Sequence, residues 1–187
     1  VRVMEAGSRI TFSDVVVRDT FGRQRDGWFG RGFEANQGGR GEITRGLFER
    51  NREVGLIAGG VGSSLILQDV TVRDTLGRDV DGRGGTGISA ICGAVVEVVR
   101  FAVTGNALCG VQVAHGGDGS GPSCPDCGSM DLRDGEVSFN AVCGANVQCA
   151  GFDFNRLMDN VWYHDNNGQN LETTELPVPA AGTPIEE

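Results

Sequence analysis

The sequence predicts an all-β protein built as a solenoid, in which the chain winds into stacked coils. Three observations predict it: an internal repeat, a series of short segments that alternate apolar and polar residues, and 31 glycines among 187 residues. Alternation with a period of two is typical of β-strands, and no segment keeps helical spacing over three turns. Glycine at about one position in six suits a chain with many tight corners.

The internal repeat has a period of 55 residues and needs no gap. Residues 14–20 read DVVVRDT and fall on residues 69–75, which read DVTVRDT. The pairs Gly22/Gly77 and Asp26/Asp81 follow at the same shift. A fixed period of this length indicates a repeat architecture whose units stack on one another.

Each repeat unit contains more than one strand pattern, so we expect two coils in each unit and about six coils in all. The segments are rich in β-branched residues and are bounded by Gly or Asn. The leading strand of each coil is expected near residues 10–18, 42–50, 65–73, 95–105, 130–139 and 152–159.

The corners between strands carry the phrase Asn-x-x-x-Gly, which begins at Asn51, Asn106 and Asn140. Asn and Gly tolerate the left-handed backbone that tight corners require. Since a solenoid repeats the same corner in every coil, we expect these asparagine side chains to stack and to satisfy the backbone groups of the corner.

This repeat texture resembles the right-handed parallel β-helix of the pectin-lyase-like superfamily, in the short-coil form found in large secreted bacterial proteins. The resemblance covers about residues 1–165 and implies that fold for residues 1–168, with an inserted loop at 116–129. Residues 169–187 are acidic and contain proline, and are expected to form an extended tail. At the 55-residue shift residue 1 falls on Leu56, just after a corner, so the chain enters in the middle of a coil. We therefore expect it to be the C-terminal part of a longer solenoid whose remainder is missing.

Composition excludes several classes of function. A net charge of −9 has the wrong sign for a general nucleic-acid-binding protein. No run of 18 apolar residues is present, so no membrane-spanning segment is expected. No phosphate-binding loop or dinucleotide fingerprint occurs, and no cofactor is expected. All 16 basic residues are arginine, which fits a GC-rich bacterial genome.

The long loops 18–27 and 73–82 are copies of one another and should protrude from one side of the solenoid. Arginine forks suit carboxylates or sulfates, aspartates suit sugar hydroxyls, and a tryptophan adds a stacking surface. The candidate ligand-binding residues are therefore Asp19, Arg23, Asp26, Trp28, Asp74, Arg78 and Asp81. The alternative is that these arginines and aspartates pair with each other and hold the loops in place.

Asp79 and Asp81 are the calcium candidates of these loops. They match part of a calcium loop, but the spacing of an EF-hand is absent and Gln24 replaces the first aspartate in the other copy. No other metal ligands are assigned.

The resemblance implies two kinds of catalysis, hydrolase and lyase chemistry on polysaccharides. Hydrolases of this fold carry adjacent aspartates, a Gly-His-Gly-like turn and an Arg-x-Lys motif. This chain has no Asp-Asp pair and no lysine, and Ala114-His115-Gly116 is only a fragment of the turn. Lyases of the fold use a basic residue beside calcium-held aspartates. In this chain Arg100 or Arg133 would have to act as that basic residue.

The leading hypothesis is therefore a non-catalytic segment with a structural role, or with recognition of a polysaccharide or another surface protein through the side that bears the two long loops. The alternative is a hydrolase or lyase acting on acidic glycans, with no catalytic residue assigned. His115 and His164 are interpreted as structural or solvated. The geometry of the loop carboxylates distinguishes the two hypotheses.

Six cysteines lie within one third of the chain: Cys92, Cys109, Cys124, Cys127, Cys143 and Cys149. An even, clustered set favours disulfides and an extracellular or bacterial outer-surface location. Cys109 and Cys143 take the same place after the corner asparagine in consecutive coils, so their Cα atoms should lie about 5 Å apart. Zinc on Cys124 and Cys127, completed by Cys109, Cys143 or His115, and free buried thiols remain the alternatives.

Overall fold

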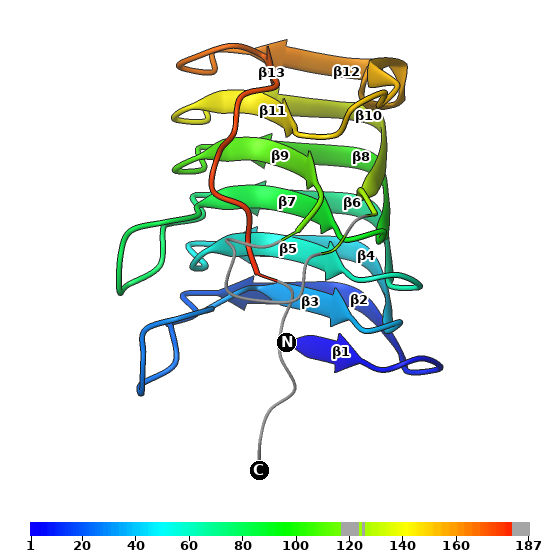
Figure 1. Cartoon of the computed structure of the whole chain (residues 1–187), viewed down its shortest axis with the longest axis vertical. Coiled ribbons are helices and arrows are strands. Elements are labelled where there is room, and N and C mark those ends of the chain that lie inside the picture. The colour runs from blue at the N-terminus through cyan, green and yellow to red at the C-terminus, as the bar shows by residue number, and fades with distance from the viewer. Residues whose placement is uncertain (117–123, 125, 181–187) are drawn as a thin grey trace.

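The structure is a computed structural model that describes residues 1–116, 124 and 126–180, and these residues form an all-β protein with two parallel sheets (Figure 1). Most of the predicted inserted loop 116–129 and the last seven residues of the predicted tail lie outside the described residues. None of the described helices is long and apolar enough to cross a membrane.

The chain alternates between the two sheets, so each strand pairs with the strand two places along the sequence. One sheet, called sheet A, contains β1 (Arg2–Met4), β3 (Phe33–Asn36), β5 (Val54–Gly59), β7 (Thr86–Ile91), β9 (Cys109–Ala114), β11 (Cys143–Val147) and β13 (Leu171–Glu172). The other, sheet B, contains β2 (Arg9–Arg18), β4 (Arg40–Glu49), β6 (Ser64–Arg73), β8 (Val95–Thr104), β10 (Ser129–Ser138) and β12 (Asp159–His164). This arrangement of stacked parallel strands is compatible with a solenoid.

The 55-residue repeat matches the strand order, because it carries β2 onto β6 and β4 onto β8. The first five expected leading strands coincide with β2, β4, β6, β8 and β10 to within a few residues. The sixth, expected at 152–159, differs: Phe154–Leu157 forms the 3-10 helix η1, and β12 follows it. The Asp153 side chain accepts a hydrogen bond from Asn155 N, and this cap starts the helix where the strand was expected.

Each strand of sheet B bends at one residue whose backbone is left-handed. In the five long strands this is the sixth residue, and the six bends stack across the sheet, at Asp14, Arg45, Asp69, Arg100, Asp134 and Asn160. Arg45 donates to both carboxylate oxygens of Asp14, at 2.6 and 2.7 Å. Arg100 does the same to Asp69, at 2.6 and 2.8 Å. Alternating charge thus stabilises a row of bends that like charges would disfavour.

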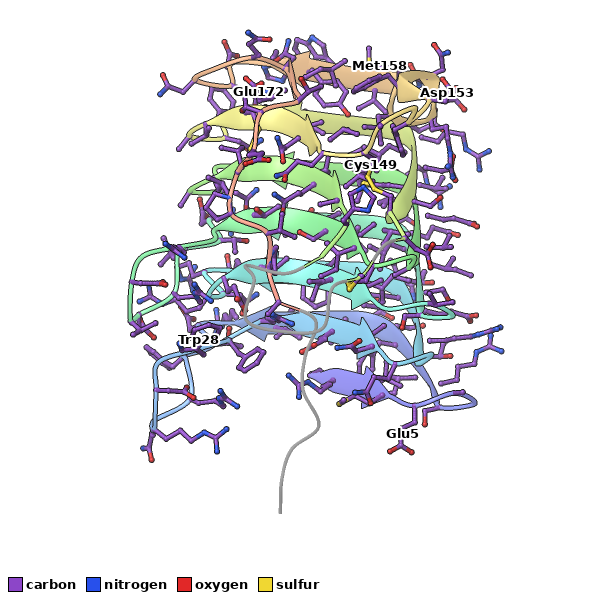
Figure 2. All side chains as sticks on the ribbon, viewed as in Figure 1. Glu5, Trp28, Cys149, Asp153, Met158 and Glu172 are labelled. Atoms are coloured by element: carbon purple, nitrogen blue, oxygen red, sulfur yellow. A yellow bond between two sulfur atoms is a disulfide. The ribbon has the colours of Figure 1, made fainter. Side chains whose placement is uncertain are left out.

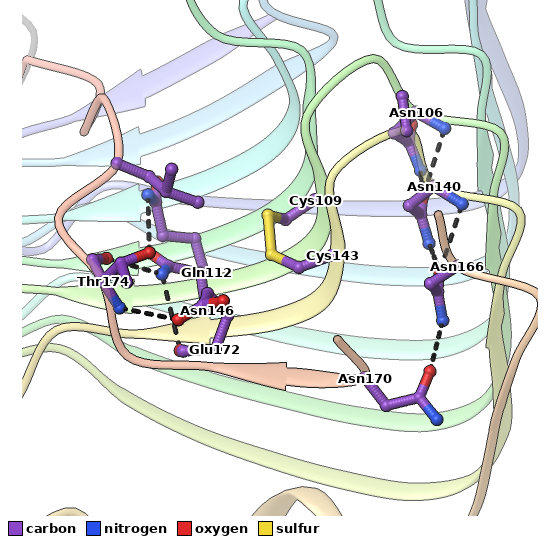
Figure 3. The surroundings of a disulfide bond; sticks show 12 residues. Asn106, Cys109, Gln112, Asn140, Cys143, Asn146, Asn166, Asn170, Glu172 and Thr174 are labelled. Carbon is purple, nitrogen blue, oxygen red and sulfur yellow. Dashed lines mark hydrogen bonds between the residues drawn. A yellow bond between two sulfur atoms is a disulfide. The ribbon is translucent and has the colours of Figure 1, made fainter. Parts of the chain in front are cut away.

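A second row, of buried polar side chains, runs along the corner after sheet B. Asn106 Nδ2 donates to Asn140 Oδ1, and Asn140 Nδ2 donates to Asn166 Oδ1, both at 2.9 Å (Figure 3). Asn51 does not touch Asn106 directly, since Thr75 lies between them in this row and its backbone N–H donates to Asn106 Oδ1 at 3.0 Å. We call Asn51, Asn106, Asn140 and Asn166 the asparagine ladder.

The core lies between the two sheets and is formed by alternate side chains of their strands. Fully buried members include Phe33 and Leu56 from sheet A and Phe48, Leu67 and Leu132 from sheet B. Sheet A is also buried on its outer face, where β5, β7 and β9 have no exposed residue. The segment after β13 descends across this outer face (Figure 1), and Val178 from that segment and Cys124 pack on its buried cluster.

Candidate functional site

Two long loops, residues 19–30 and 74–85, leave sheet B and protrude from the same side of the molecule (Figure 1). They fold alike. In the first, Arg23 N donates to Trp28 O and Gly27 N donates to Arg23 O. In the second, Arg78 N donates to Arg83 O and Gly82 N donates to Arg78 O. The repeated sequence therefore gives one loop shape twice.

The two loops contact one another. Gly22 N donates to Asp79 Oδ2 at 3.1 Å, and Gly27 lies against Val80 of the other loop. A side chain at Gly22 would collide with the carbonyl of Gly27, so the tight base of the loop requires glycine. The loops thus form one joint surface, which we call the loop ledge, comprising residues 19–30 and 74–85.

Each loop pairs its own arginine and aspartate. Arg23 lies 2.6 Å from Asp26, and Arg78 lies 2.7 Å from Asp81. Desolvation alone would raise the pKa of Asp26, but hydrogen bonds from Trp28 N and Arg23 outweigh it, so the pKa lies below its ordinary value. The pKa of Asp81 is lowered in the same way, by hydrogen bonds from Arg78 and from the backbone of Arg83 that outweigh desolvation.

The other predicted acidic residues of the ledge also face arginine. Asp19 accepts two hydrogen bonds from Arg50, at 2.7 and 2.9 Å, which lower its pKa. Asp74 lies farther from its neighbour, with 3.9 Å to Arg73 Nε. The calcium candidate Asp79 lies 3.1 Å from Arg52. An arginine beside a carboxylate occupies the oxygen lone pairs that a calcium ion would need.

Two aromatic residues of the ledge, Trp28 and Phe29, stack on arginines. The guanidinium of Arg78 lies 4.2 Å from the centre of the Trp28 ring. Phe29, next along the chain, has Arg23 at 4.4 Å and Arg31 at 4.7 Å from its ring centre. Trp28 lies near the point where its loop returns to sheet A (Figure 2). Such cation–π contacts fix the side chains of the ledge.

Several ledge residues were not singled out from the sequence. Phe21 is 74 % exposed, and the side chains of Arg25 and Arg83 are 69 % and 61 % exposed. Both arginines contact an aspartate that already has a closer arginine partner, since Arg25 lies 3.4 Å from Asp26 and Arg83 lies 3.9 Å from Asp81. Phe21 and Arg25 lie within the loop 18–27 and Arg83 directly follows the loop 73–82, and this placement was the signal that could have found them.

A buried ion-pair cluster lies behind the ledge and was also missed. Arg31 contacts Glu53 at 2.6 Å and Glu34 at 2.9 Å, and all three side chains are almost fully buried. Arg78 Nη1 reaches Glu53 at 3.5 Å and joins this cluster to the second loop. Buried charges of this kind persist only when they are paired and hydrogen-bonded, and the cluster anchors the ledge to sheet A.

All six cysteines form disulfides, which confirms the favoured interpretation. Cys109 and Cys143 are joined with their Cα atoms 4.6 Å apart, near the expected distance. The other pairs are Cys92–Cys124 and Cys127–Cys149. The ligand atoms of His115, Cys127 and Cys149 lie within 4.8 Å of one another. Zinc is bound by thiolate sulfur, so a disulfide removes the two sulfurs from such a site.

The remaining candidates for catalysis lie apart from the ledge. Arg100 is held by Asp69 in the row of bends, and Arg133 Nε lies 3.8 Å from Asp134. His164 stacks on Trp162, with ring centres 3.7 Å apart. Its Nδ1 is 2.7 Å from Asp165, and this hydrogen bond raises the pKa of the imidazole.

Comparisons of the chain with protein-family models, with curated proteins and with solved structures found no match. The function is therefore argued from the site itself.

Proposed function

We propose that this chain is a non-catalytic segment of an extracellular or bacterial outer-surface protein that recognises an acidic glycan through the loop ledge. The fold that goes with this proposal is a right-handed parallel β-helix of the pectin-lyase-like type with about six coils. Two stacked parallel sheets and three disulfides support it.

The observation that carries the proposal is a pair of exposed arginines on the ledge, Arg25 and Arg83, whose side chains are 69 % and 61 % exposed. Asp26 and Asp81 are each bonded by one arginine of their own loop, at 2.6 and 2.7 Å. Arg25 and Arg83 lie at the surface and make longer contacts to the same carboxylates. Arg25 lies 3.4 Å from Asp26, and Arg83 lies 3.9 Å from Asp81. The ledge as a whole has four arginines and five aspartates, and these two exposed guanidinium groups are the ones that suit the carboxylates or sulfates of an extended polymer.

The same pairing argues against hydrolysis at the ledge. Glycoside hydrolysis requires one carboxyl group that can hold a proton and a second that acts as base or nucleophile. Asp26 and Asp81 both have pKa values below the ordinary range, because hydrogen bonds from arginine and backbone N–H groups stabilise their charged forms. Neither is suited to donate a proton at neutral pH.

The test is a glycan array that includes uronic-acid and sulfated polymers, followed by affinity measurements on any glycan bound. The double variant Arg25→Ala, Arg83→Ala is expected to weaken binding about 5- to 30-fold, from two exposed ion pairs of up to about 1 kcal/mol each. Arg133→Ala, which removes a similarly exposed arginine from sheet B, is the matched control and should leave the affinity unchanged.

Equal affinity of the double variant and the wild type would overturn the assignment of the ledge. A reducing-end assay on the same polymers separates binding from turnover. Release of reducing ends by the wild type would replace the proposal with the polysaccharide-active alternative.

A further inference from the structure

The outer face of sheet A has a buried polar floor. Ser89, Gln112 and Asn146 pair in register across β7, β9 and β11. They point outward, because their neighbours Ile88 and Val111 face the core. All three are fully buried although they lie on an outer face, so other parts of the chain cover them.

The C-terminal segment 172–180 lies over the floor, and the polar side chains of the floor hydrogen-bond to its main-chain carbonyls. Asn146 Nδ2 donates to the carbonyls of Glu172 and Thr174, at 3.4 and 3.0 Å (Figure 3). Gln112 Nε2 donates to Pro177 O at 3.1 Å. Two further donors, Gln148 and Arg31, bind the carbonyls of Leu176 and Ala180 at 2.9 and 2.7 Å. Contacts to carbonyls do not depend on the sequence of the occupant.

The occupant leaves part of the floor unsatisfied. Within the described part of the chain, the buried Ser89 Oγ and Gln112 Oε1 atoms have no hydrogen-bond partner. The segment above them contains Pro177 and Pro179, which have no N–H to donate. Because unpaired buried acceptors are costly, an extended chain with N–H groups at these places would fit the floor better.

The segment also fills the groove only in part. Cavities of about 490 and 540 Å³ border it, one beside Arg78 and Arg83 and the other beside Phe152. Residues 173–175 are exposed to solvent. Val178 is the apolar anchor, since it packs on the outer cluster that contains Ile57 and Ile91.

We propose that the outer face of sheet A is a binding groove for an extended polypeptide, and that residues 173–180 are an exchangeable occupant held there in cis. A polypeptide is favoured over a glycan because the floor presents a row of N–H donors to main-chain carbonyls and retains acceptors for main-chain N–H groups. This inference is independent of the proposed function of the loop ledge.

The experiment uses the full chain and a fluorescent peptide of residues 171–180 (LETTELPVPA), with binding followed by fluorescence polarisation. Val178→Asp removes the apolar anchor of the cis occupant and is expected to tighten peptide binding at least tenfold relative to the wild type. Val16→Asp places the same change on an exposed residue of sheet B and is the matched control, with wild-type affinity expected.

The floor is tested in the Val178→Asp background by Asn146→Leu, which removes the donor to two carbonyls and should lower the affinity at least tenfold. Gln148→Leu, at the half-buried margin of the groove, tests the same donor role if Asn146→Leu fails to fold by circular dichroism. A peptide with alanine in place of Pro177 and Pro179 should bind several-fold more tightly than the native peptide.

Three results would overturn the inference. Equal peptide affinity of Val178→Asp and the wild type would show that the segment does not compete for the groove. Weaker binding of the alanine peptide would contradict the role of the unpaired acceptors. Binding of neutral oligosaccharides by Val178→Asp, without binding of either peptide, would assign the groove to a glycan.

Discussion

Replacement of Asn140 by alanine should destabilise the fold by about 4 kcal/mol, because it orphans two buried donors that each cost about 1–3 kcal/mol when unpaired. Asn140 is fully buried in the middle of the asparagine ladder. Its Oδ1 accepts from the backbone N–H of Asn106 at 3.1 Å and from the Asn106 side chain at 2.9 Å. Alanine offers neither donor an acceptor, and water cannot reach the closed corner to replace it.

The assay is equilibrium unfolding in guanidinium chloride, followed by far-ultraviolet circular dichroism, with free energies extrapolated to water. Asn167→Ala is the control, since Asn167 is exposed and donates to the carbonyl of Ala141 at 3.1 Å. Its loss should cost less than about 1 kcal/mol, as is usual for surface substitutions. A cost below about 1 kcal/mol for Asn140→Ala as well would refute the view that the ladder satisfies the corners.

Two further predictions concern the Cys109–Cys143 disulfide and His164. Replacing Cys109 and Cys143 together by alanine should lower the free energy of unfolding by about 3–4 kcal/mol, since the bond closes a loop with a sequence separation of 34; an unchanged denaturation midpoint would contradict this. His164 should titrate above its ordinary value of 6.5, first because Asp165 hydrogen-bonds to the ring and then because Glu136 lies 3.2 Å away. The charged ring therefore contributes its full stabilisation below that unfolded-state value and loses it as the pH rises through the higher folded-state pKa. NMR titration of the wild type against Asp165→Asn checks the shift, and equal pKa values would exclude Asp165 as its main cause.

Local repetition made much of the fold predictable. The 55-residue shift maps Asp14 onto Asp69, and residue 45 onto residue 100 in the same way, and the two Asp–Arg pairs that these four residues form lie at equivalent bends. The same alignment of corners predicted that Cys109 and Cys143 would be joined. Stacked units repeat their geometry, so a residue's place in the repeat specifies its neighbour in the next strand.

The structural features that were predicted wrongly or not predicted lie in segments that are not repeated. Residues 152–159 were expected to be a strand, but the Asp153 cap forms the helix η1, an event confined to one position. The pairs Cys92–Cys124 and Cys127–Cys149 join an inserted loop whose path no repeat describes. Because the repeat does not describe this loop, the alignment of the repeats predicted only one of the three disulfides, Cys109–Cys143.

The loop ledge shows the same division within one site. The sequence predicted that two copies of one loop would protrude together, and it left open whether their arginines and aspartates bind a ligand or each other. Distances between side chains decided that Arg23 bonds Asp26 and that Arg78 both bonds Asp81 and stacks on Trp28. Pairing depends on ångström-scale placement, which spacing along the chain does not specify.

By itself, the sequence determined the all-β class, the stacking period, the stacked corner asparagines and the disulfide chemistry, because each follows from short-range patterns that recur. Only the tertiary structure decided that Arg31, Glu34 and Glu53 form a buried cluster and that residues 172–180 cover sheet A. These contacts join the C-terminal segment to β11, and Arg31 to Glu53, which is 22 residues along the chain. Their formation depends on how the sheets position them in space, a property that no local pattern encodes.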